Sequence, residues 1–259
     1  MKKVTIKNIL NKKNKLPIAC LTAYNKNTAK IADKYCDIIL VGDSLGMVLY
    51  GMKTTRDVKI ETMILHAKAV KDASKRSLVV VDMPYKTYTN RFVAYKNAKR
   101  VIKSTNCDAI KLEGGVKIAN IIKYLVKKKI PVMGHIGLLP QTTKNFKAKG
   151  KNYTQRIKIL NDAIEVSNSG AFAVIIECVV ESLAKKITKS ISIPTIGIGA
   201  SKFCDGQILV SEDMLGLGET FPRFVKRYTN LNKVIEKSVK SYVKDVKNRR
   251  FPYSNNVYK

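Results

Sequence analysis

Leu78-Val-Val-Val-Asp82 is the stretch of sequence that decides the fold: four apolar, branched residues followed by an aspartate. A run of this length and composition is typical of a single strand buried on both faces. Similar apolar runs occupy seven other places, at residues 17–24, 37–42, 109–112, 131–134, 173–176, 194–197 and 207–210. The chain therefore contains eight candidate strands of similar length.

Longer, amphipathic and lysine-rich segments separate these runs. They predict helices at residues 61–74, 91–104, 118–128, 182–190 and 232–247, with further helical stretches that end near Tyr35 and Gly170. Strands that alternate with helices indicate a parallel sheet covered by helices. Eight such units favour the α/β class and a single (βα)8 TIM barrel, with residues 1–259 forming one catalytic domain. An open, doubly wound sheet is the alternative, but the glycine-rich phosphate turn expected after its first strand is absent.

The composition narrows the setting in which this domain works. The chain has 259 residues, 45% of them hydrophobic, which is enough to bury one large core. It has no apolar run of about 18 residues and no signal-peptide pattern, so we expect neither a membrane span nor export. Its five cysteines are scattered singly, which suits free thiols in a reducing cytoplasm and forms no zinc pattern.

The chain is strongly basic, with 49 Lys and Arg against 19 Asp and Glu and a net charge of +30. Such a charge can indicate a nucleic-acid partner, which would require a clustered basic face. The basic residues are instead spread along the whole chain. We therefore favour biased residue usage as the cause of the charge, and we expect small anionic substrates and no specific nucleic-acid partner.

The chemistry is indicated by the residues at which consecutive apolar runs end. Five runs in succession end at a polar residue: Asp43, Asp82, Glu113, His135 and Glu177. In a parallel barrel these positions are the carboxyl ends of the strands, which all face the mouth where barrel enzymes carry their active sites. One or two of these residues could simply cap the following helix. Five in succession favour an active site.

Residue type and spacing suggest a role for each of these side chains. Lys111 and Glu113 are two residues apart on one predicted strand, so both point to the same face. The carboxylates of Asp43, Asp82 and Glu113 are hard oxygen ligands suited to Mg²⁺ or Mn²⁺, some of them through water. A divalent ion of this kind can stabilise the enolate of a 2-oxo acid, provided that a base removes the neighbouring proton.

The other polar residues at the strand ends supply the remaining functions of such a site. Glu177 is the candidate base, Lys111 the candidate partner of the enolate oxygen, and Ser44 a candidate ligand of the substrate carboxylate. His135 either orients the substrate or is a hydrogen-bonded core histidine, and its place at a strand end favours substrate binding.

Several motifs resemble one enzyme family over about residues 19–252. They read VGDSLGMVLYG at 41–51, VVDMPY at 80–85, AIKLEGG at 109–115, PVMGHIGLLPQ at 131–141, VIIECV at 174–179 and IPTIGIGA at 193–200. Together they are similar to the ketopantoate hydroxymethyltransferases. The resemblance implies a TIM barrel of the phosphoenolpyruvate-mutase superfamily. It also implies transfer of a hydroxymethyl group from 5,10-methylenetetrahydrofolate to 3-methyl-2-oxobutanoate, which gives 2-dehydropantoate for pantothenate and coenzyme A biosynthesis.

The resemblance carries over residue by residue. It implies Mg²⁺ on Asp43, Asp82 and Glu113, an oxo-acid site at Asp43, Ser44, Asp82 and Lys111, and Glu177 as the base. It also implies a cytoplasmic enzyme that forms a ring homo-oligomer, often a decamer of two pentamers. The loop at 142–150 is shorter than the family pattern, which puts the folate contacts in doubt.

A lyase or mutase of the same superfamily is the second enzymatic alternative. It would be expected to carry a catalytic cysteine on a flexible loop. Residues 83–105 and 137–153 contain no cysteine, which disfavours this alternative.

Overall fold

The barrel predicted from the sequence is present. The computed structural model describes residues 2–143 and 147–258, and it divides the chain into two compact units, residues 1–210 and 211–259. Within the described part of the first unit, parallel strands form one closed barrel in sequence order, and pairing of β8 with β1 closes it. The strands are β1 (Ile18–Thr22), β2 (Ile38–Val41), β3 (Leu78–Asp82), β4 (Ala109–Glu113), β5 (Val132–Gly137), β6 (Ala173–Glu177), β7 (Thr195–Ile198) and β8 (Gly206–Leu209).

Alternating residues along each strand belong to two different apolar layers. On β4, Ala109 packs in a cluster inside the barrel, whereas Ile110 and Leu112 pack in the layer between strands and helices. This is the two-residue period of a strand that is buried on both faces. Because Lys111 and Glu113 share a face with Ala109, their side chains point into the barrel above the apolar layer.

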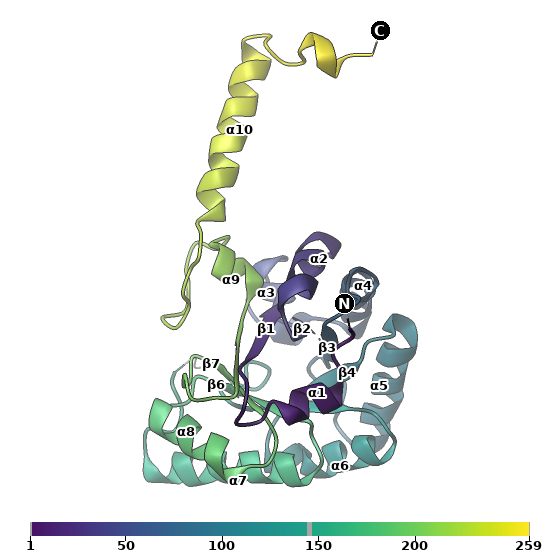
Figure 1. Ribbon diagram of the computed structural model, residues 1–259, viewed down its shortest axis with the longest axis vertical. Coiled ribbons are helices and arrows are strands. Elements are labelled where there is room, and N and C mark those ends of the chain that lie inside the picture. Colours follow the sequence, from purple (N-terminus) through teal and green to yellow (C-terminus); the bar gives the residue numbers. More distant parts are fainter. Residues whose placement is uncertain (1, 144–146, 259) are drawn as a thin grey trace. The chain divides into compact units, whose positions relative to one another are not determined.

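Helices surround the strands of this unit, as Figure 1 shows for α4 to α8. They are α2 (Lys26–Tyr35), α3 (Leu45–Val48), α4 (Ile60–Ala73), α5 (Arg91–Thr105), α6 (Ala119–Lys127), α7 (Tyr153–Asn168) and α8 (Glu181–Ser190), with single 3-10 turns η1 (Thr55–Asp57) and η2 (Val116–Ile118). Several begin at an asparagine that caps their first turn; Asn90, for example, accepts hydrogen bonds from the backbone N–H groups of Phe92 and Val93.

An N-terminal segment with helix α1 (Ile6–Asn11) lies at the amino ends of the strands. Ile9 is completely buried in the cluster inside the barrel. Three lysines of this segment form ion pairs with aspartates that immediately precede strands: Lys3 with Asp108 (2.8 Å), Lys12 with Asp37 (2.7 Å) and Lys13 with Asp205 (2.9 Å). This arrangement leaves the opposite, carboxyl end of the barrel for chemistry.

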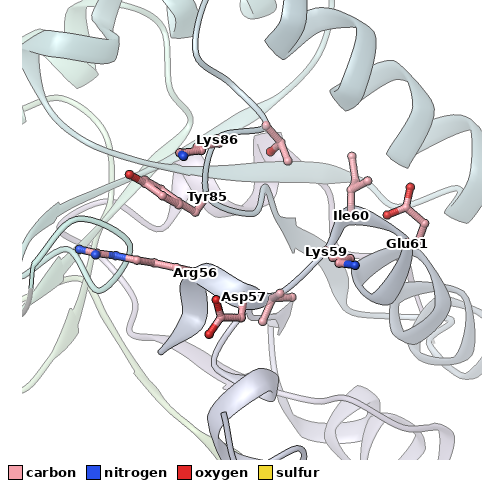
Figure 2. A pocket seen from close by; sticks show the side chains of 9 residues that line it. Arg56, Asp57, Lys59, Ile60, Glu61, Tyr85 and Lys86 are labelled. Carbon is pink, nitrogen blue, oxygen red and sulfur yellow. The ribbon is translucent and has the colours of Figure 1, made fainter. Parts of the chain in front are cut away.

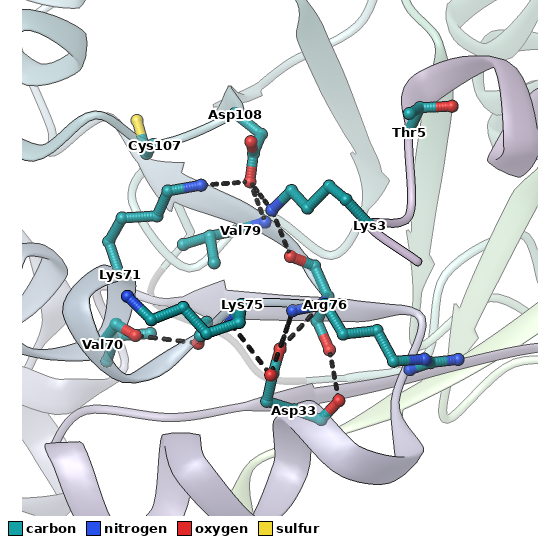
Figure 3. A network of polar contacts seen from close by, with 12 residues as sticks. Lys3, Thr5, Asp33, Val70, Lys71, Lys75, Arg76, Val79, Cys107 and Asp108 are labelled. Atoms are coloured by element: carbon teal, nitrogen blue, oxygen red, sulfur yellow. Dashed lines mark hydrogen bonds and ion pairs between the residues drawn. The ribbon is translucent and has the colours of Figure 1, made fainter. Parts of the chain in front are cut away.

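Aspartates near the amino ends of the strands also bind the backbone. Asp108 accepts from the N–H of Val79 and from the ammonium groups of Lys3 and Lys71 (Figure 3). Asp33 accepts from the backbone of residues 75–77, at the entrance to β3. Although burial alone would raise the pKa values of both carboxyls, these donors hold them below the ordinary range.

The structure corrects the expected βα rhythm at one place. No helix joins β7 to β8 across residues 199–205, all of which are described. Instead, the Asp205 carboxylate accepts from the backbone N–H and the hydroxyl of Thr195, which ties the end of this short turn to the start of β7.

Residues 211–259 are a compact unit of their own, with α9 (Ser211–Leu215), α10 (Leu231–Lys247) and the turn η3 (Ser254–Asn256). The expected helix at 232–247 is α10. The expectation that residues 1–259 make one catalytic domain stays a prediction. Across the described residues, no helix combines the length and apolar character that a bilayer crossing demands, and all five cysteines are free.

Candidate active site

The polar residues predicted from the strand ends meet at the carboxyl end of the barrel. Asp82, Glu113 and Glu177 are the last residues of β3, β4 and β6, His135 lies in β5, and Asp43 follows β2. Four of these side chains are buried, and Glu177 is partly exposed. A continuous series of contacts connects them from β2 to β6.

Lys111 supplies positive charge to the first half of this cluster. Its ammonium Nζ lies 3.0 Å from Asp82 Oδ1, and the side chains of both residues are about 5% exposed or less. The contact is placed for charge attraction and not for an aligned hydrogen bond, because Asp82 Oδ1 has no hydrogen-bonding partner among the described residues. Burial alone would lower the pKa of Lys111, but the charges of the surrounding carboxylates outweigh burial and raise it.

His135 connects the second half of the cluster. Its Nδ1 lies 3.3 Å from Glu113 Oε1, and its Nε2 lies 3.1 Å from Glu177 Oε2. Burial and the charge of Lys111 would lower its pKa, but the two glutamates raise it to about 9. At this pKa the imidazole is a cation at neutral pH, held between the two glutamates by charge attraction, because its Nε2 has no hydrogen-bonding partner among the described residues. This geometry favours a polar role over that of an ordinary core histidine.

Asp43 completes the cluster on the side of β2. Its backbone N–H donates to Asp82 Oδ2 (3.0 Å), and its own carboxylate accepts from the side chain of Gln141 (2.7 Å). Burial, followed by the negative charges of Asp82 and Glu113, raises the pKa of Asp43 well above its ordinary value. Three buried carboxylates thus stand close enough to repel one another.

This donor set fits a hard divalent cation. Asp43, Asp82 and Glu113 offer carboxylate oxygens with unfavourable mutual repulsion, and Asp82 Oδ1 has an unused acceptor site. Among residues 2–143 and 147–258, no three acidic, cysteine or histidine side chains are spaced for direct coordination. The arrangement therefore suits an ion held partly through water, as Mg²⁺ commonly is.

The contacts of Ser44 and Gln141 bring two further residues to the site, one at the start of a helix and one in a loop. Ser44 begins α3, and its hydroxyl lies 2.7 Å from the hydroxyl of the buried Tyr24. Gln141, in the loop after β5, reaches Asp43 and also binds Glu113 through its backbone N–H. Gln141 does not end an apolar run, so periodicity does not mark it. Tyr24 closes the run at 17–24 but is not among the residues predicted for the site. The only sequence signal for Gln141 is its place in the PVMGHIGLLPQ motif.

A glycine lets β5 approach β6 closely beside Glu177. Gly137 has φ +93°, and a Cβ atom built on it would lie 2.4 Å from the carbonyl oxygen of Glu177. Any side chain at this position would be strained and would displace the end of β6. Gly137 thereby helps to fix the position of the candidate base.

A pocket of about 570 Å³ lies between η1, the start of α4 and the loop after β3. Residues 56–61 line it together with Tyr85, Lys86 and Thr87, and Figure 2 shows Arg56 and Tyr85 facing each other across it. The Arg56 guanidinium carbon lies 5.6 Å from the centre of the Tyr85 ring, and Arg56 Nε donates to the carbonyl of Gln141 (2.8 Å). The pocket is therefore adjacent to the cluster through Gln141. Of the expected short loop at 142–150, residues 144–146 lie outside the described residues.

Known proteins of high sequence similarity share one name. The family described as ketopantoate hydroxymethyltransferase matches residues 3–254 of this chain. A 3-methyl-2-oxobutanoate hydroxymethyltransferase of Pelagibacter ubique is 52% identical over 253 residues, which cover 98% of each chain. The enzyme of that name from Bartonella henselae is 51% identical and covers all of this chain and 96% of its own.

Solved structures of much lower identity share the fold. A phosphonopyruvate hydrolase superposes with a TM-score of 0.66 at 9% identity, covering 100% of this chain and 92% of its own. A 2,3-dimethylmalate lyase, described as a member of the PEP mutase/isocitrate lyase superfamily, gives 0.63 at 12% identity, covering 97% and 87%. These likenesses confirm the barrel, and the matches over the full chain confirm the resemblance seen in the motifs. The chain belongs to the ketopantoate hydroxymethyltransferase family.

Proposed function

We propose that this enzyme transfers a hydroxymethyl group from 5,10-methylenetetrahydrofolate to 3-methyl-2-oxobutanoate, giving 2-dehydropantoate for pantothenate and coenzyme A biosynthesis. The observation that carries the proposal is the cluster at the carboxyl ends of the strands. It consists of three carboxylates, a buried lysine and a histidine–glutamate pair, connected by contacts at one end of the barrel. Relatives about 50% identical over the whole chain are named for this transfer.

The reaction needs a base and a partner for negative charge. Glu177 takes the proton from C3 of the oxo acid, and the electron pair of that C–H bond moves toward the C2 oxygen. Lys111 is the candidate cation beside that oxygen, and Ser44 and Asp43 are candidates to hold the substrate carboxylate. His135 holds Glu177 in place through the contact of 3.1 Å and is also a candidate to orient the substrate.

The atoms balance across the whole reaction. One C–H bond of the oxo acid, one O–H bond of water and both C–N bonds of the folate methylene bridge break. A C–C bond forms between C3 and the one-carbon unit, and a C–O bond forms between that unit and the water oxygen. The proton from C3 and one proton from water end on the two folate nitrogens, and tetrahydrofolate leaves. No oxidant or reductant is required.

Mg²⁺ is the proposed ion, held by Asp43, Asp82 and Glu113, in part through water. When bound, it would act as a Lewis acid that stabilises negative charge on the substrate oxygens. The repulsion among three buried carboxylates supports this proposal, because a cation at their centre would relieve it.

The direct test is formation of product by purified protein. The protein is incubated with Mg²⁺, the folate donor and the oxo acid, and 2-dehydropantoate is measured by mass spectrometry. We expect product from the wild-type chain and a loss of roughly 10²–10⁴-fold in kcat for Glu177→Gln. The proposal fails if the wild-type chain gives no product, or if Asp82→Ala and Glu177→Gln match the wild type.

We further propose a cytoplasmic ring homo-oligomer, either a decamer of two pentamers or another ring. Free cysteines support the reducing compartment. Light scattering on the full chain tests the assembly, and a monomer at micromolar concentration would contradict it. We propose no nucleic-acid partner, because the basic residues are spread along the whole chain.

A further inference from the structure

Gln141 makes a contact with each of its polar atoms at the edge of the carboxylate cluster. Its side-chain Nε2 donates to Asp43 Oδ2 (2.7 Å) and to the carbonyl of Met83 (3.0 Å). Its Oε1 accepts from the hydroxyl of Tyr88 (2.5 Å). Its backbone N–H donates to Glu113 Oε2 (3.1 Å), and its carbonyl accepts from Arg56 Nε (2.8 Å). The residue is only 1% exposed.

Two of these partners are carboxylates that repel each other. Asp43 follows β2 and Glu113 ends β4, and the negative charge of each raises the cost of burying the other. Lys111 lies against Asp82, and His135 lies against Glu113. Gln141 is the residue that donates to both Asp43 and Glu113, one through its side chain and one through its backbone. It therefore bridges these two carboxylates.

We propose that Gln141 is a positioning residue that sets Asp43 and Glu113 at the separation required to bind a divalent cation and the oxo acid. This inference rests on the function proposed above for the same site. Gln141 acts through the two carboxylates and does not itself contact the reacting atoms. Tyr88 and Arg56 hold Gln141 from the outer side, from the loop after β3 and from η1.

The contacts require an amide at this position. Nε2 must donate to a carboxylate while Oε1 accepts from a hydroxyl, and only an amide supplies both at these distances. Gln141→Met removes all three side-chain hydrogen bonds, to Asp43, Met83 and Tyr88, with little change in volume. Gln141→Glu keeps the acceptor for Tyr88 but turns a second negative oxygen toward Asp43. A positioning role therefore predicts that the glutamate variant binds the oxo acid less well than the methionine variant.

Binding of Mn²⁺, measured by electron paramagnetic resonance on the full chain, tests this role without turnover. We expect about 10- to 100-fold weaker Mn²⁺ binding for Gln141→Met, as for other residues that orient metal ligands. Tyr88→Phe, which keeps the bond from Gln141 to Asp43, should weaken Mn²⁺ binding by about 3- to 10-fold. The matched control is Gln155→Met, because Gln155 is exposed and its side-chain oxygen accepts from the backbone N–H of Gly150, away from the carboxylates.

The outcomes separate this inference from the proposed function. The inference is overturned if Gln141→Met and Tyr88→Phe both bind Mn²⁺ with an affinity within about twofold of the wild type, whatever their thermal stability. It is also overturned by a Gln141→Glu variant that binds the oxo acid as tightly as Gln141→Met, measured by calorimetry. A wild-type chain that binds no Mn²⁺ overturns the inference as well. A wild-type chain that binds Mn²⁺ but makes no 2-dehydropantoate contradicts the proposed function alone and leaves the Gln141 comparison valid.

Discussion

Replacing Lys111 by methionine should strongly destabilise the barrel when no metal is present. The ammonium lies 3.0 Å from Asp82 Oδ1, and both side chains are almost completely buried. The substitution leaves the Asp82 carboxyl buried and without its cation, beside Asp43 and Glu113. Removing one partner of such a pair costs about 3–5 kcal/mol of the free energy of unfolding. For a chain of this length, that corresponds to a fall in Tm of roughly 6–20 °C.

The assay is thermal unfolding at pH 7 in the presence of a chelator, so that no divalent cation replaces the ammonium. Lys158→Met is the matched control, because the Lys158 side chain is 71% exposed and its contact with Asp162 is a long one of 3.4 Å. It should change the free energy of unfolding by no more than about 0.5 kcal/mol. Adding Asp82→Asn to Lys111→Met should restore part of the lost stability. The reasoning is refuted if Lys111→Met melts within about 2 °C of the wild type, or if the second substitution lowers Tm further.

Three further predictions concern the frame that holds the site. Asp205→Asn should lower the free energy of unfolding at pH 7 by about 1.5–3 kcal/mol, because it removes a charge-assisted bond to Lys13. Burial alone would raise the pKa of Asp205, but Lys13 and backbone donors lower it. The stability that the Asp205 carboxylate contributes is therefore present above its ordinary pKa and is lost as pH falls through the lower pKa of the folded protein. In urea titrations from pH 7 to pH 2, the free energies of unfolding of the wild type and Asp205→Asn should converge. Gly137→Ala should reduce stability by about 1–3 kcal/mol and reduce kcat more than KM, since the new Cβ meets the backbone of Glu177; unchanged kcat would contradict the close approach. Ile9→Ala should cost about 2–5 kcal/mol in chemical denaturation, because Ile9 is completely buried inside the barrel; a loss below about 1 kcal/mol would show that α1 does not fill that end.

The part of the fold that follows from a two-residue or a 3.6-residue period could be predicted from the sequence. The run at 78–82 is β3, and the helix expected at 91–104 is α5, one residue longer. Strand alternation also predicted that Lys111 and Glu113 share one face, and in the structure that face is the inside of the barrel. These features depend on local pattern and burial, which a single sequence displays.

Features that depend on contacts distant in sequence could not be predicted in this way. The helix missing between β7 and β8 reflects the tie between Asp205 and Thr195. The two hydrogen bonds from Gln141 join carboxylates on β2 and β4 to a loop that follows β5. No periodicity marks a loop residue of this kind, because its position depends on how the barrel closes.

Hydrogen exchange at C3 of 3-methyl-2-oxobutanoate tests the central claim most directly. The protein and Mg²⁺ are mixed with the oxo acid in D₂O without folate, and loss of the C3 proton signal is followed by NMR. If Glu177 is the base at the mouth of the barrel, the wild-type chain accelerates the exchange and Glu177→Gln slows it by roughly 10²–10⁴-fold while still binding the oxo acid. Exchange at equal rates in the two proteins, or no acceleration by the wild-type chain, would contradict the account.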